Sequence, residues 1–300
     1  MGICIKKALQ EAASFLRRRG IAAPRREAEV MLAFLLGQGA AYLYAHGEKE
    51  LSGELRGKYA VLLQRRGENV PLAYLTGEKE FMGLPFRVQA GVLIPRPETE
   101  HLVETALQWC RETFPQVARG QQLHILDLGT GCGNIAVSLA YFLPAASVLG
   151  VDCSAKALAV ARLNAQKMGV APRVHFFCGA FGTFFAYKRQ RFHVVVANPP
   201  YVPRPELPVL PPEVQKEPSL ALDGGEDGLA AYRQIFSCIQ KFLFPGGLLA
   251  LEVGANQAGA VLSLGRAAGL TGKTEIVPDL AGHERVVTFR AGQGRRAGHF

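Results

Sequence analysis

Two apolar runs that stop abruptly place the strongest constraint on the fold of this chain. The first, residues 124–128, continues directly into Gly-x-Gly-x-Gly at residues 129–133. The second, residues 194–197, continues into Asn-Pro-Pro-Tyr at residues 198–201. Open α/β sheets bind ligands just outside the carboxyl ends of their strands. The two runs therefore predict one site with two halves, a glycine-floored pocket and a polar clamp.

The region from Gly120 to Arg290 alternates strand-like apolar runs with helical patterns, which is typical of a mostly parallel sheet covered on both faces. We expect an α/β domain with a doubly wound, seven-stranded, Rossmann-like sheet. Strands are expected near residues 123–128, 147–151, 174–178, 193–197, 247–253, 272–277 and 285–290. Helices are expected near residues 134–142, 155–168, 228–243 and 256–268, with turns at Gly246-Gly247 and Gly282-His283.

The first 69 residues carry helical patterns and no chemistry-bearing cluster. Gly20 is placed to end one helix, Pro24 to begin a second and Ser52 to cap a third. We expect residues 1–69 to form a small helical bundle that serves packing or substrate recognition.

Residues 70–96 are expected to form a β-hairpin linker, because short strand-like runs alternate there with glycine turns. The runs are Leu75–Gly77, Glu80–Leu84 and Phe86–Val88. Pro97 is expected to begin the next helix, so that the sheet domain spans residues 97–290. Residues 291–300 are expected to be a frayed, disordered tail.

The formal net charge of +9 has two interpretations: solvated helix faces with a basic tail, which we favour, or a surface that approaches RNA or a ribosome-bound partner. Basic residues cluster at Arg17–Arg19, Arg25-Arg26, Arg65-Arg66 and Arg295-Arg296. Six cysteines without a C-x-x-C pair oppose a disulfide framework or zinc site and favour a reducing cytoplasm. No apolar run reaches the roughly 18–20 residues of a membrane helix, and no secretory signal is evident.

The spacing of the glycine run indicates which cofactor it binds. A dinucleotide fingerprint, G-x-G-x-x-G, would need its third glycine at Asn134, whereas here it is Gly133. An acid, Asp127, precedes the run. This spacing resembles motif I of S-adenosylmethionine-dependent methyltransferases rather than a nicotinamide site. Asp152 follows the next strand, where a carboxylate can accept both ribose hydroxyls. A plain strand-turn-helix corner is the structural alternative.

The Asn-Pro-Pro-Tyr run suits a planar amino group. Such a nitrogen is a poor nucleophile, because its lone pair is delocalised. The Asn198 side-chain oxygen and the Pro199 carbonyl can accept its two hydrogens and face it towards a methyl donor. Pro200 stiffens the turn, and Tyr201 offers an aromatic face. No dedicated base is required if the proton leaves after the nitrogen becomes cationic. The run alone leaves open a glutamine amide, an adenine amino group or a simple loop start.

Residues 10–290 resemble the release-factor glutamine N5-methyltransferases, the HemK or PrmC family. Besides the glycine and Asn-Pro-Pro-Tyr runs, the resemblance rests on Pro71–Gly77, Val92–Glu100, Glu217–Gly225, Asp227–Leu229, Tyr232-Arg233, Pro245–Gly247, Glu252–Gly254, Gln257, Asp279 and Glu284–Val286. The family implies a helical domain, a hairpin linker and a methyltransferase domain. It also implies methyl transfer from S-adenosylmethionine to the glutamine amide in the Gly-Gly-Gln loop of class I peptide chain release factors.

Position by position, the resemblance assigns site residues. Those for the cofactor are Asp127, Gly129, Thr130, Gly131, Cys132, Gly133, Asp152, Phe181 and Asn198. Those for the glutamine are Asn198, Pro199, Pro200 and Tyr201, with Arg96 and Glu98 beside the pocket or in surface pairs. No metal is expected.

Two departures from the family pattern affect the cofactor half. Many members carry an acid near position 180 that can reach the adenine amino group, but Ala180 offers none, so adenine binding would depend on Phe181 and backbone contacts. Cys132 stands where Thr or Ser is common and is expected to be an inert packed thiol.

Three other functions compete with this assignment. They are an adenine-N6 methyltransferase of DNA or RNA, a ribosomal-protein glutamine methyltransferase and a non-catalytic interaction module. No separate target-recognition domain is evident, so a stable nucleic-acid complex is not expected. The intact glycine run, Asp152 and Asn198 argue against a non-catalytic module.

Overall fold

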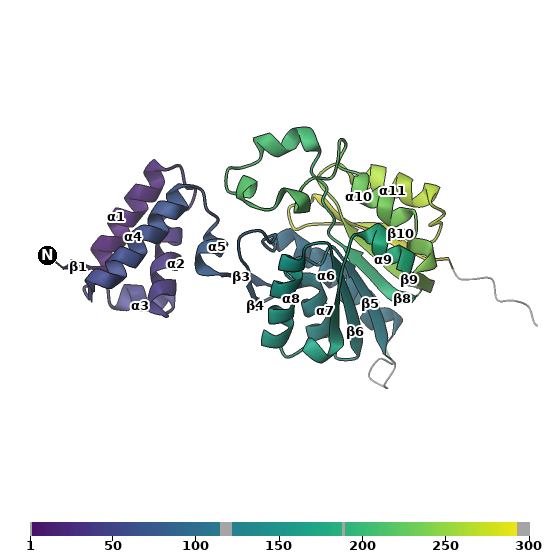
Figure 1. Cartoon of the computed structure of the whole chain (residues 1–300), viewed down its shortest axis with the longest axis horizontal. Coiled ribbons are helices and arrows are strands. Elements are labelled where there is room, and N and C mark those ends of the chain that lie inside the picture. The colour runs from purple at the N-terminus through teal and green to yellow at the C-terminus, as the bar shows by residue number, and fades with distance from the viewer. Residues whose placement is uncertain (1, 115–121, 188–189, 293–300) are drawn as a thin grey trace, which may run out of the picture. The chain divides into compact units, whose positions relative to one another are not determined.

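The computed structural model describes residues 2–114, 122–187 and 190–292, and the chain divides into two compact units (Figure 1). The first unit comprises Met1–Glu78 with Pro211–Lys216, and the second comprises Lys79–Leu210 with Glu217–Phe300. Gly120, the Arg295-Arg296 cluster and most of the predicted tail lie outside the described residues.

The first unit is a helical bundle around its own apolar core. Its elements are α1 (Ile5–Arg18), α2 (Pro24–Leu36), α3 (Ala40–Ala45), α4 (Gly53–Gly67), α5 (Leu72–Thr76) and the antiparallel pair β1 (Ile3–Cys4) and β2 (Glu50–Leu51). The predicted helix signals are confirmed: Gly20 follows α1 with a φ of +78°, and Pro24 begins α2. The Ser52 hydroxyl accepts the Leu55 amide at 3.2 Å and caps α4.

The strand predicted at Leu75–Gly77 is wrong, because Leu75 and Thr76 belong to helix α5. The segment between Pro71 and Gly77 contains good helix formers, and Gly77 ends the helix with a left-handed φ of +75°. A hairpin is present, but the run expected as one strand, Glu80–Leu84, contains its turn, so the predicted strand bounds are wrong there. Strands β3 (Glu78–Phe81) and β4 (Leu84–Arg87) flank a Met82-Gly83 turn.

The second unit contains a seven-stranded sheet, which confirms the predicted fold class. Across the sheet the strands are β10 (Thr274–Pro278), β11 (Glu284–Arg290), β9 (Leu243–Glu252), β8 (Phe192–Ala197), β5 (Leu123–Leu128), β6 (Ala146–Asp152) and β7 (Val174–Cys178). Strand β11 is antiparallel to both of its neighbours, and the other pairs are parallel.

Helices cover both faces of this sheet (Figure 1). One face packs on α6 (Glu100–Thr113), α7 (Asn134–Phe142) and α8 (Ala155–Lys167), and the other on α9 (Phe181–Tyr187), α10 (Ala230–Phe236) and α11 (Ala258–Ala267). The period of two along β8 feeds both cores. Val194 and Val196 join the first core, and Val195 and Ala197 join the second.

Two sequence predictions in the sheet unit need correction. The helix expected at 228–243 is only α10, followed by a single 3₁₀ turn, Ile239–Lys241. Gly246-Gly247 is not a turn before a strand, because it lies inside β9. The β8–β9 pairing shifts register between Phe192 and Val194, and Gly246 has a φ of +76° beside this irregularity. A bulge therefore absorbs the glycines that looked like a strand boundary. Helix α9 was not predicted.

The parallel strands bring four segments to one edge of the sheet. Pairings Leu128–Val151, Leu128–Ala197 and Ala197–Leu251 align the carboxyl ends of β6, β5, β8 and β9. Because β6 follows β5 on one side and β8 lies on the other, this edge is a topological switch point. The glycine run therefore lies between Asp152 and Asn198 along this edge, with Glu252 beyond Asn198.

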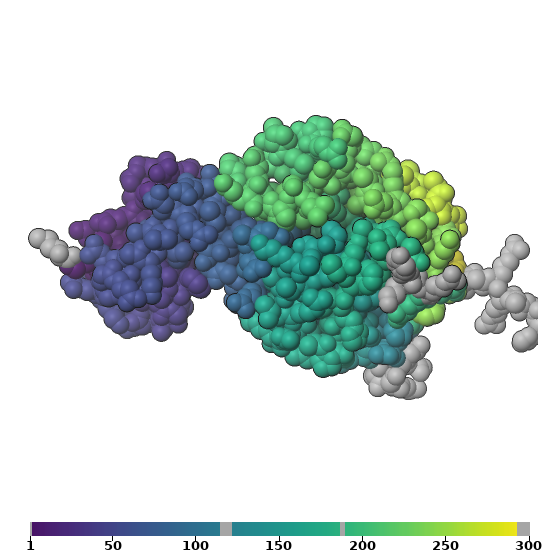
Figure 2. Space-filling view, in the orientation of Figure 1, coloured from purple at the N-terminus to yellow at the C-terminus, as the bar shows by residue number. Residues whose placement is uncertain are grey.

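The segment that follows β8, coloured green, is exposed on the surface (Figure 2), with Val209 at 80% and Leu220 at 64% exposure. Among the described residues, no helix is long and apolar enough to cross a membrane.

Candidate active site

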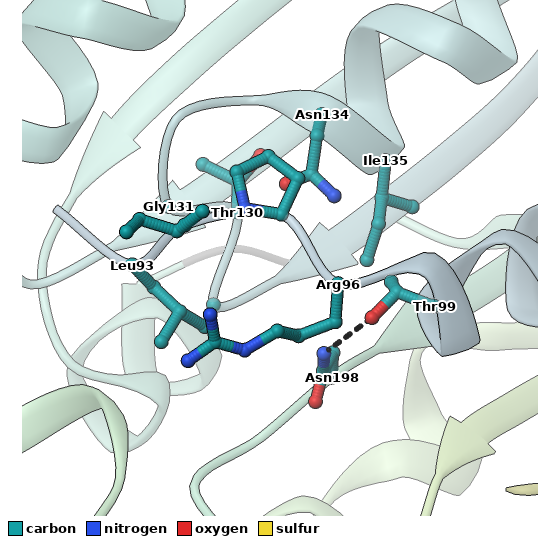
Figure 3. Close-up of a pocket in the computed structure, with 11 residues that line it drawn as sticks. Leu93, Arg96, Thr99, Thr130, Gly131, Asn134, Ile135 and Asn198 are labelled. Atoms are coloured by element: carbon teal, nitrogen blue, oxygen red, sulfur yellow. Dashed lines mark hydrogen bonds between the residues drawn. The ribbon is translucent and has the colours of Figure 1, made fainter. Parts of the chain in front are cut away.

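A pocket opens at this edge of the sheet and brings the two predicted halves together (Figure 3). Its lining residues come from the segment before α6, the glycine run, the first turn of α7 and the end of β8. They are Leu93, Ile94, Pro95, Arg96, Thr99, Gly129, Thr130, Gly131, Asn134, Ile135 and Asn198. Two motifs about 70 residues apart in the chain thus share one cavity.

The glycine run turns sharply at each glycine. Gly129, Gly131 and Gly133 have φ angles of +78°, +55° and +82°, a region that L side chains rarely adopt. A Cβ on Gly133 would lie 3.0 Å from the Cβ of Ala161, so close packing also requires glycine there. A Cβ on Gly131 would meet no atom within 4 Å. At Gly129 and Gly131 the pocket is therefore lined by backbone atoms, and no side chain fills the space.

Asp127 supports this loop from beneath. Its carboxylate accepts the Thr130 hydroxyl at 2.6 Å and the Ala136 amide at 3.2 Å. The side chain is fully buried, and burial raises the pKa of Asp127 to about 7. The residue does not reach the pocket surface. Its expected contribution to cofactor binding is consequently indirect, through the shape of the loop.

Asp152 lies at the end of β6 and holds the other side of the loop. One carboxylate oxygen accepts the Gly131 amide at 2.9 Å and the other accepts the Ser154 amide at 2.8 Å. Burial raises the pKa of Asp152. A carboxylate has about four lone-pair sites, so each oxygen keeps one that a ribose hydroxyl can use.

Cys132 and Phe181 were both predicted to contribute to the cofactor half of the site. The Cys132 thiol is buried, which raises its pKa to about 12, and its backbone carbonyl accepts the Asn164 side chain at 2.8 Å. Phe181 is half-buried at the start of α9. A Cβ on Gly129 would lie 3.7 Å from the Phe181 ring and 3.6 Å from the Asn198 carbonyl oxygen. The ring therefore borders the space above Gly129.

Asn198 directly follows β8 and lines the pocket, while Pro199 is buried and Pro200 is half-buried. The Asn198 Nδ2 donates to the Thr99 hydroxyl at 3.0 Å (Figure 3). With the NH2 end of the amide so occupied, Oδ1 is the end left for a ligand. Tyr201 is half-buried, and burial raises the pKa of its phenol to about 12.

Gln257 fixes the turn after Tyr201. Its Nε2 donates to the Tyr201 carbonyl at 2.9 Å, and its Oε1 accepts the Gly254 amide at 3.0 Å. A Cβ on Gly228 would lie 2.5 Å from the same carbonyl, so glycine is needed opposite the turn. The Asn-Pro-Pro-Tyr run is thus held by residues far along the chain.

Arg96 lines the pocket and also pairs with Glu217, whereas Glu98 is half-buried and is not among the lining residues. The second oxygen of the Glu217 carboxylate accepts the Ile94 amide at 2.9 Å. Of the two predicted flanking residues, the structure places only Arg96 at the cavity.

Sequence reasoning assigned no role to Thr99 or Glu252, although both lie in segments that carry the family resemblance. Glu252 is 2% exposed and directly ends the buried strand β9. A carboxylate that terminates an aliphatic strand is the same signal that singled out Asp152. Thr99 has no comparable signal, because its proximity to Asn198 is purely tertiary.

Comparison with known proteins agrees with both units. Residues 7–77 match the family model described as the PrmC N-terminal domain, and residues 120–259 match a methyltransferase domain. The release factor glutamine methyltransferase of Moorella thermoacetica is 43% identical over 281 residues, which covers 94% of this chain and 96% of that protein. The protein of the same name from Geobacter sulfurreducens is 40% identical over 289 residues, 96% and 97% of the two chains.

Among solved structures, a methyltransferase from Pyrococcus furiosus superposes with a TM-score of 0.50 at 17% identity, covering 71% of this chain and 92% of that one. This likeness concerns the fold alone. The identity across nearly the full length of the curated relatives decides the family. This chain is a methyltransferase and belongs to the release factor glutamine methyltransferase family.

Proposed function

We propose that this enzyme transfers a methyl group from S-adenosylmethionine to the side-chain amide nitrogen (N5) of the glutamine in the Gly-Gly-Gln loop of class I peptide chain release factors. The observation that carries the proposal is the meeting of Gly129–Gly131 and Asn198 in one pocket. Relatives that match this chain almost end to end bear the name of this activity. The proposed substrate and six free cysteines fit a cytoplasmic enzyme.

The glycine half fits S-adenosylmethionine. Gly129 and Gly131 leave space where side chains would intrude, and Asp152 keeps lone pairs for ribose hydroxyls. The first turn of α7 faces the pocket through Asn134 and Ile135, and a helix N-terminus favours a carboxylate group. When bound, the cofactor supplies an electrophilic methyl group. Phe181 offers an aromatic surface for adenine in place of an acidic side chain.

The Asn198 half fits a primary amide. Asn198 Oδ1 and the Pro199 carbonyl would accept the two N–H groups and fix the direction of the nitrogen lone pair. This orientation is the principal rate contribution available to the protein, since a well-oriented intramolecular geometry can be worth about 7–11 kcal/mol. Burial raises the pKa of the Tyr201 phenol to about 12, so this group stays protonated near neutral pH and cannot serve as a base. We assign it to packing against the planar amide.

The test is methyl transfer from isotopically labelled S-adenosylmethionine to a purified class I release factor, with duplex DNA and total RNA in separate reactions. Peptide mass spectrometry locates the label, and a release factor with its Gly-Gly-Gln glutamine changed to alanine is the matched control. We expect label on that glutamine and none on the control. Label on nucleic acid alone, or elsewhere on the release factor, would overturn the proposal.

A further inference from the structure

The wall of the pocket carries a positive charge. Of the eleven described residues that line the pocket, only Arg96 has a charged side chain. That side chain is 30% exposed and lies among the other lining residues (Figure 3). S-adenosylmethionine is itself a cation at its sulfonium sulfur, and like charges in a partly desolvated pocket repel. An uncompensated Arg96 would therefore oppose binding of this cofactor.

The Glu217 carboxylate is paired with this cation. One of its oxygens accepts the Arg96 guanidinium at 2.5 Å, and the other accepts the backbone amide of Ile94 at 2.9 Å. Because the Glu217 side chain is only 2% exposed, water and salt screen its charge much less than they screen a surface carboxylate. The pair thus places donor groups at the pocket wall without adding a net charge.

The chain holds Glu217 in place through the connection that follows β8. This connection begins at Asn198–Tyr201 and closes on itself near its two ends. The Val202 amide donates to the Leu222 carbonyl at 3.0 Å, and the Gly224 amide donates to the Val202 carbonyl at 2.8 Å. Glu217 lies between these closing contacts, so its carboxylate is fixed at the pocket wall by a folded segment.

We propose that Glu217, acting through Arg96, is a specificity-determining residue that lets the pocket accept a sulfonium cation. The inference rests on the proposed function and deepens it. S-adenosylhomocysteine has the same adenosine, amino and carboxylate groups as S-adenosylmethionine, but its sulfur is neutral. The ratio of the two dissociation constants therefore isolates the effect of the sulfonium charge. Glu217 needs no contact with the reacting atoms.

The two acids that brace the glycine run do not take the place of Glu217. Asp152 accepts a backbone amide with each of its oxygens, and Asp127 accepts the Thr130 hydroxyl from beneath the loop. Neither carboxylate is paired with Arg96. Among the residues that the structure describes, the one ion-pair partner of Arg96 is Glu217. Loss of the Glu217 charge therefore leaves the guanidinium uncompensated.

The first test is Glu217→Gln, which keeps the side-chain volume and an acceptor for the Ile94 amide but removes the charge. Calorimetry without a methyl acceptor measures the two dissociation constants. Unit charges even about 10 Å apart repel appreciably at an effective dielectric constant near 20, so the dissociation constant of S-adenosylmethionine should rise about 10- to 100-fold. That of S-adenosylhomocysteine should stay within about threefold. Equal losses for both ligands, or no loss for either, overturn the inference.

Two further variants test the charge independently of packing. Arg96→Gln leaves the Glu217 carboxylate uncompensated, so the ratio of dissociation constants should shift in favour of S-adenosylmethionine. The double variant Arg96→Gln/Glu217→Gln removes both charges, and its ratio should return to within about threefold of the wild type. Raising the ionic strength from about 50 mM to about 500 mM should narrow the difference between the ligands in Glu217→Gln, because salt screens the repulsion. An unshifted ratio in Arg96→Gln contradicts the charge effect.

The matched control is Asp223→Asn on the same connection. The Asp223 carboxylate also accepts a backbone amide, that of Gly225 at 2.8 Å, and pairs with Arg204 at 3.0 Å, but none of these residues lines the pocket. Its ratio of dissociation constants should stay within about threefold of the wild type, and a shift as large as that in Glu217→Gln contradicts the inference.

The outcomes separate this inference from the proposed function. If the two ligands bind with the expected ratios but no release factor is methylated, the proposed function is wrong and the role of Glu217 stands. If release factors are methylated and Glu217→Gln leaves the ratio unchanged, only the role of Glu217 is wrong. If the wild type binds neither ligand, both are wrong.

Discussion

The two halves of the pocket are built in different ways. The Gly129–Gly133 half is local: its shape comes from positive φ angles, and Asp127 and Asp152 brace it within 25 residues of chain. The Asn198–Tyr201 half depends on distant side chains, with Thr99 99 residues before Asn198 and Gln257 56 residues after Tyr201. A backbone cradle tolerates changes in the surrounding sequence, whereas a clamp built from side chains requires each distant partner.

Asn198→Ala should give the largest effect, because it deletes the orienting acceptor and leaves the glycine half intact. Turnover should fall by roughly 10²–10³-fold, as when a single transition-state hydrogen-bonding group is removed. Affinity for S-adenosylhomocysteine, measured by calorimetry, should stay within about threefold. Loss of cofactor binding together with activity would show that the two halves are not separable.

Asp152→Ala should have the complementary effect. It removes the ribose acceptor and releases the Gly131 amide, which is held at 2.9 Å. Hydrogen bonds to a charged group are worth about 1.5–3 kcal/mol, so the cofactor dissociation constant should rise roughly 10- to 100-fold. At saturating cofactor, kcat should change much less. Unchanged cofactor affinity would overturn the ribose assignment.

Gly129→Ala should sharpen the comparison further. The added Cβ would occupy the space between the Phe181 ring and the Asn198 carbonyl, at a φ of +78°. A left-handed φ costs a non-glycine residue about 1–2 kcal/mol, so cofactor affinity and stability should both fall, each by about tenfold in its equilibrium constant. Gly182→Ala, at a helical position with no atom within 4 Å, is the matched control and should retain both. If the two variants had the same cofactor affinity and the same stability, Gly129 would not be required for the shape of the cofactor pocket.

Asp127→Asn should have the smallest effect on the reaction and a visible effect on stability. The folded chain keeps the Asp127 proton up to a pKa of about 7, whereas an unfolded aspartate releases it near 3.9. The folded state therefore binds more protons in this interval, and stability falls as pH rises from about 4 to about 7, by roughly 1–4 kcal/mol. Glu252 contributes a fall of the same sign.

In Asp127→Asn the part of the fall in stability that comes from Asp127 should vanish, and the parts that come from Glu252 and Asp152, whose pKa values are also raised by burial, should remain. Denaturant unfolding at pH 5 and pH 8 measures the difference between the wild type and the variant. A slope equal to that of the wild type would mean that Asp127 is ionised throughout.

The same contrast between local and distant contacts explains which features could be predicted from the sequence. Periodicity predicts the seven strands and the two apolar runs. The rule that ligands bind at strand ends predicts that Asn198 meets the glycine run. Leu75-Thr76 was misassigned because a five-residue helix has too few residues to show a period. Gly246-Gly247 was misassigned because a glycine pair marks a bulge as readily as a turn. Thr99 could not be found, since its role depends on tertiary proximity alone.

The most direct measurement is a crystal structure of the enzyme with S-adenosylhomocysteine and a class I release factor. We predict the cofactor product over Gly129–Gly133 with its ribose on Asp152. We also predict the Gly-Gly-Gln amide nitrogen within hydrogen-bonding distance of Asn198 Oδ1 and the Pro199 carbonyl, with Thr99 on the far side of the Asn198 amide. A glutamine bound away from Asn198, or a cofactor product bound away from the glycine run, would contradict the two-part site.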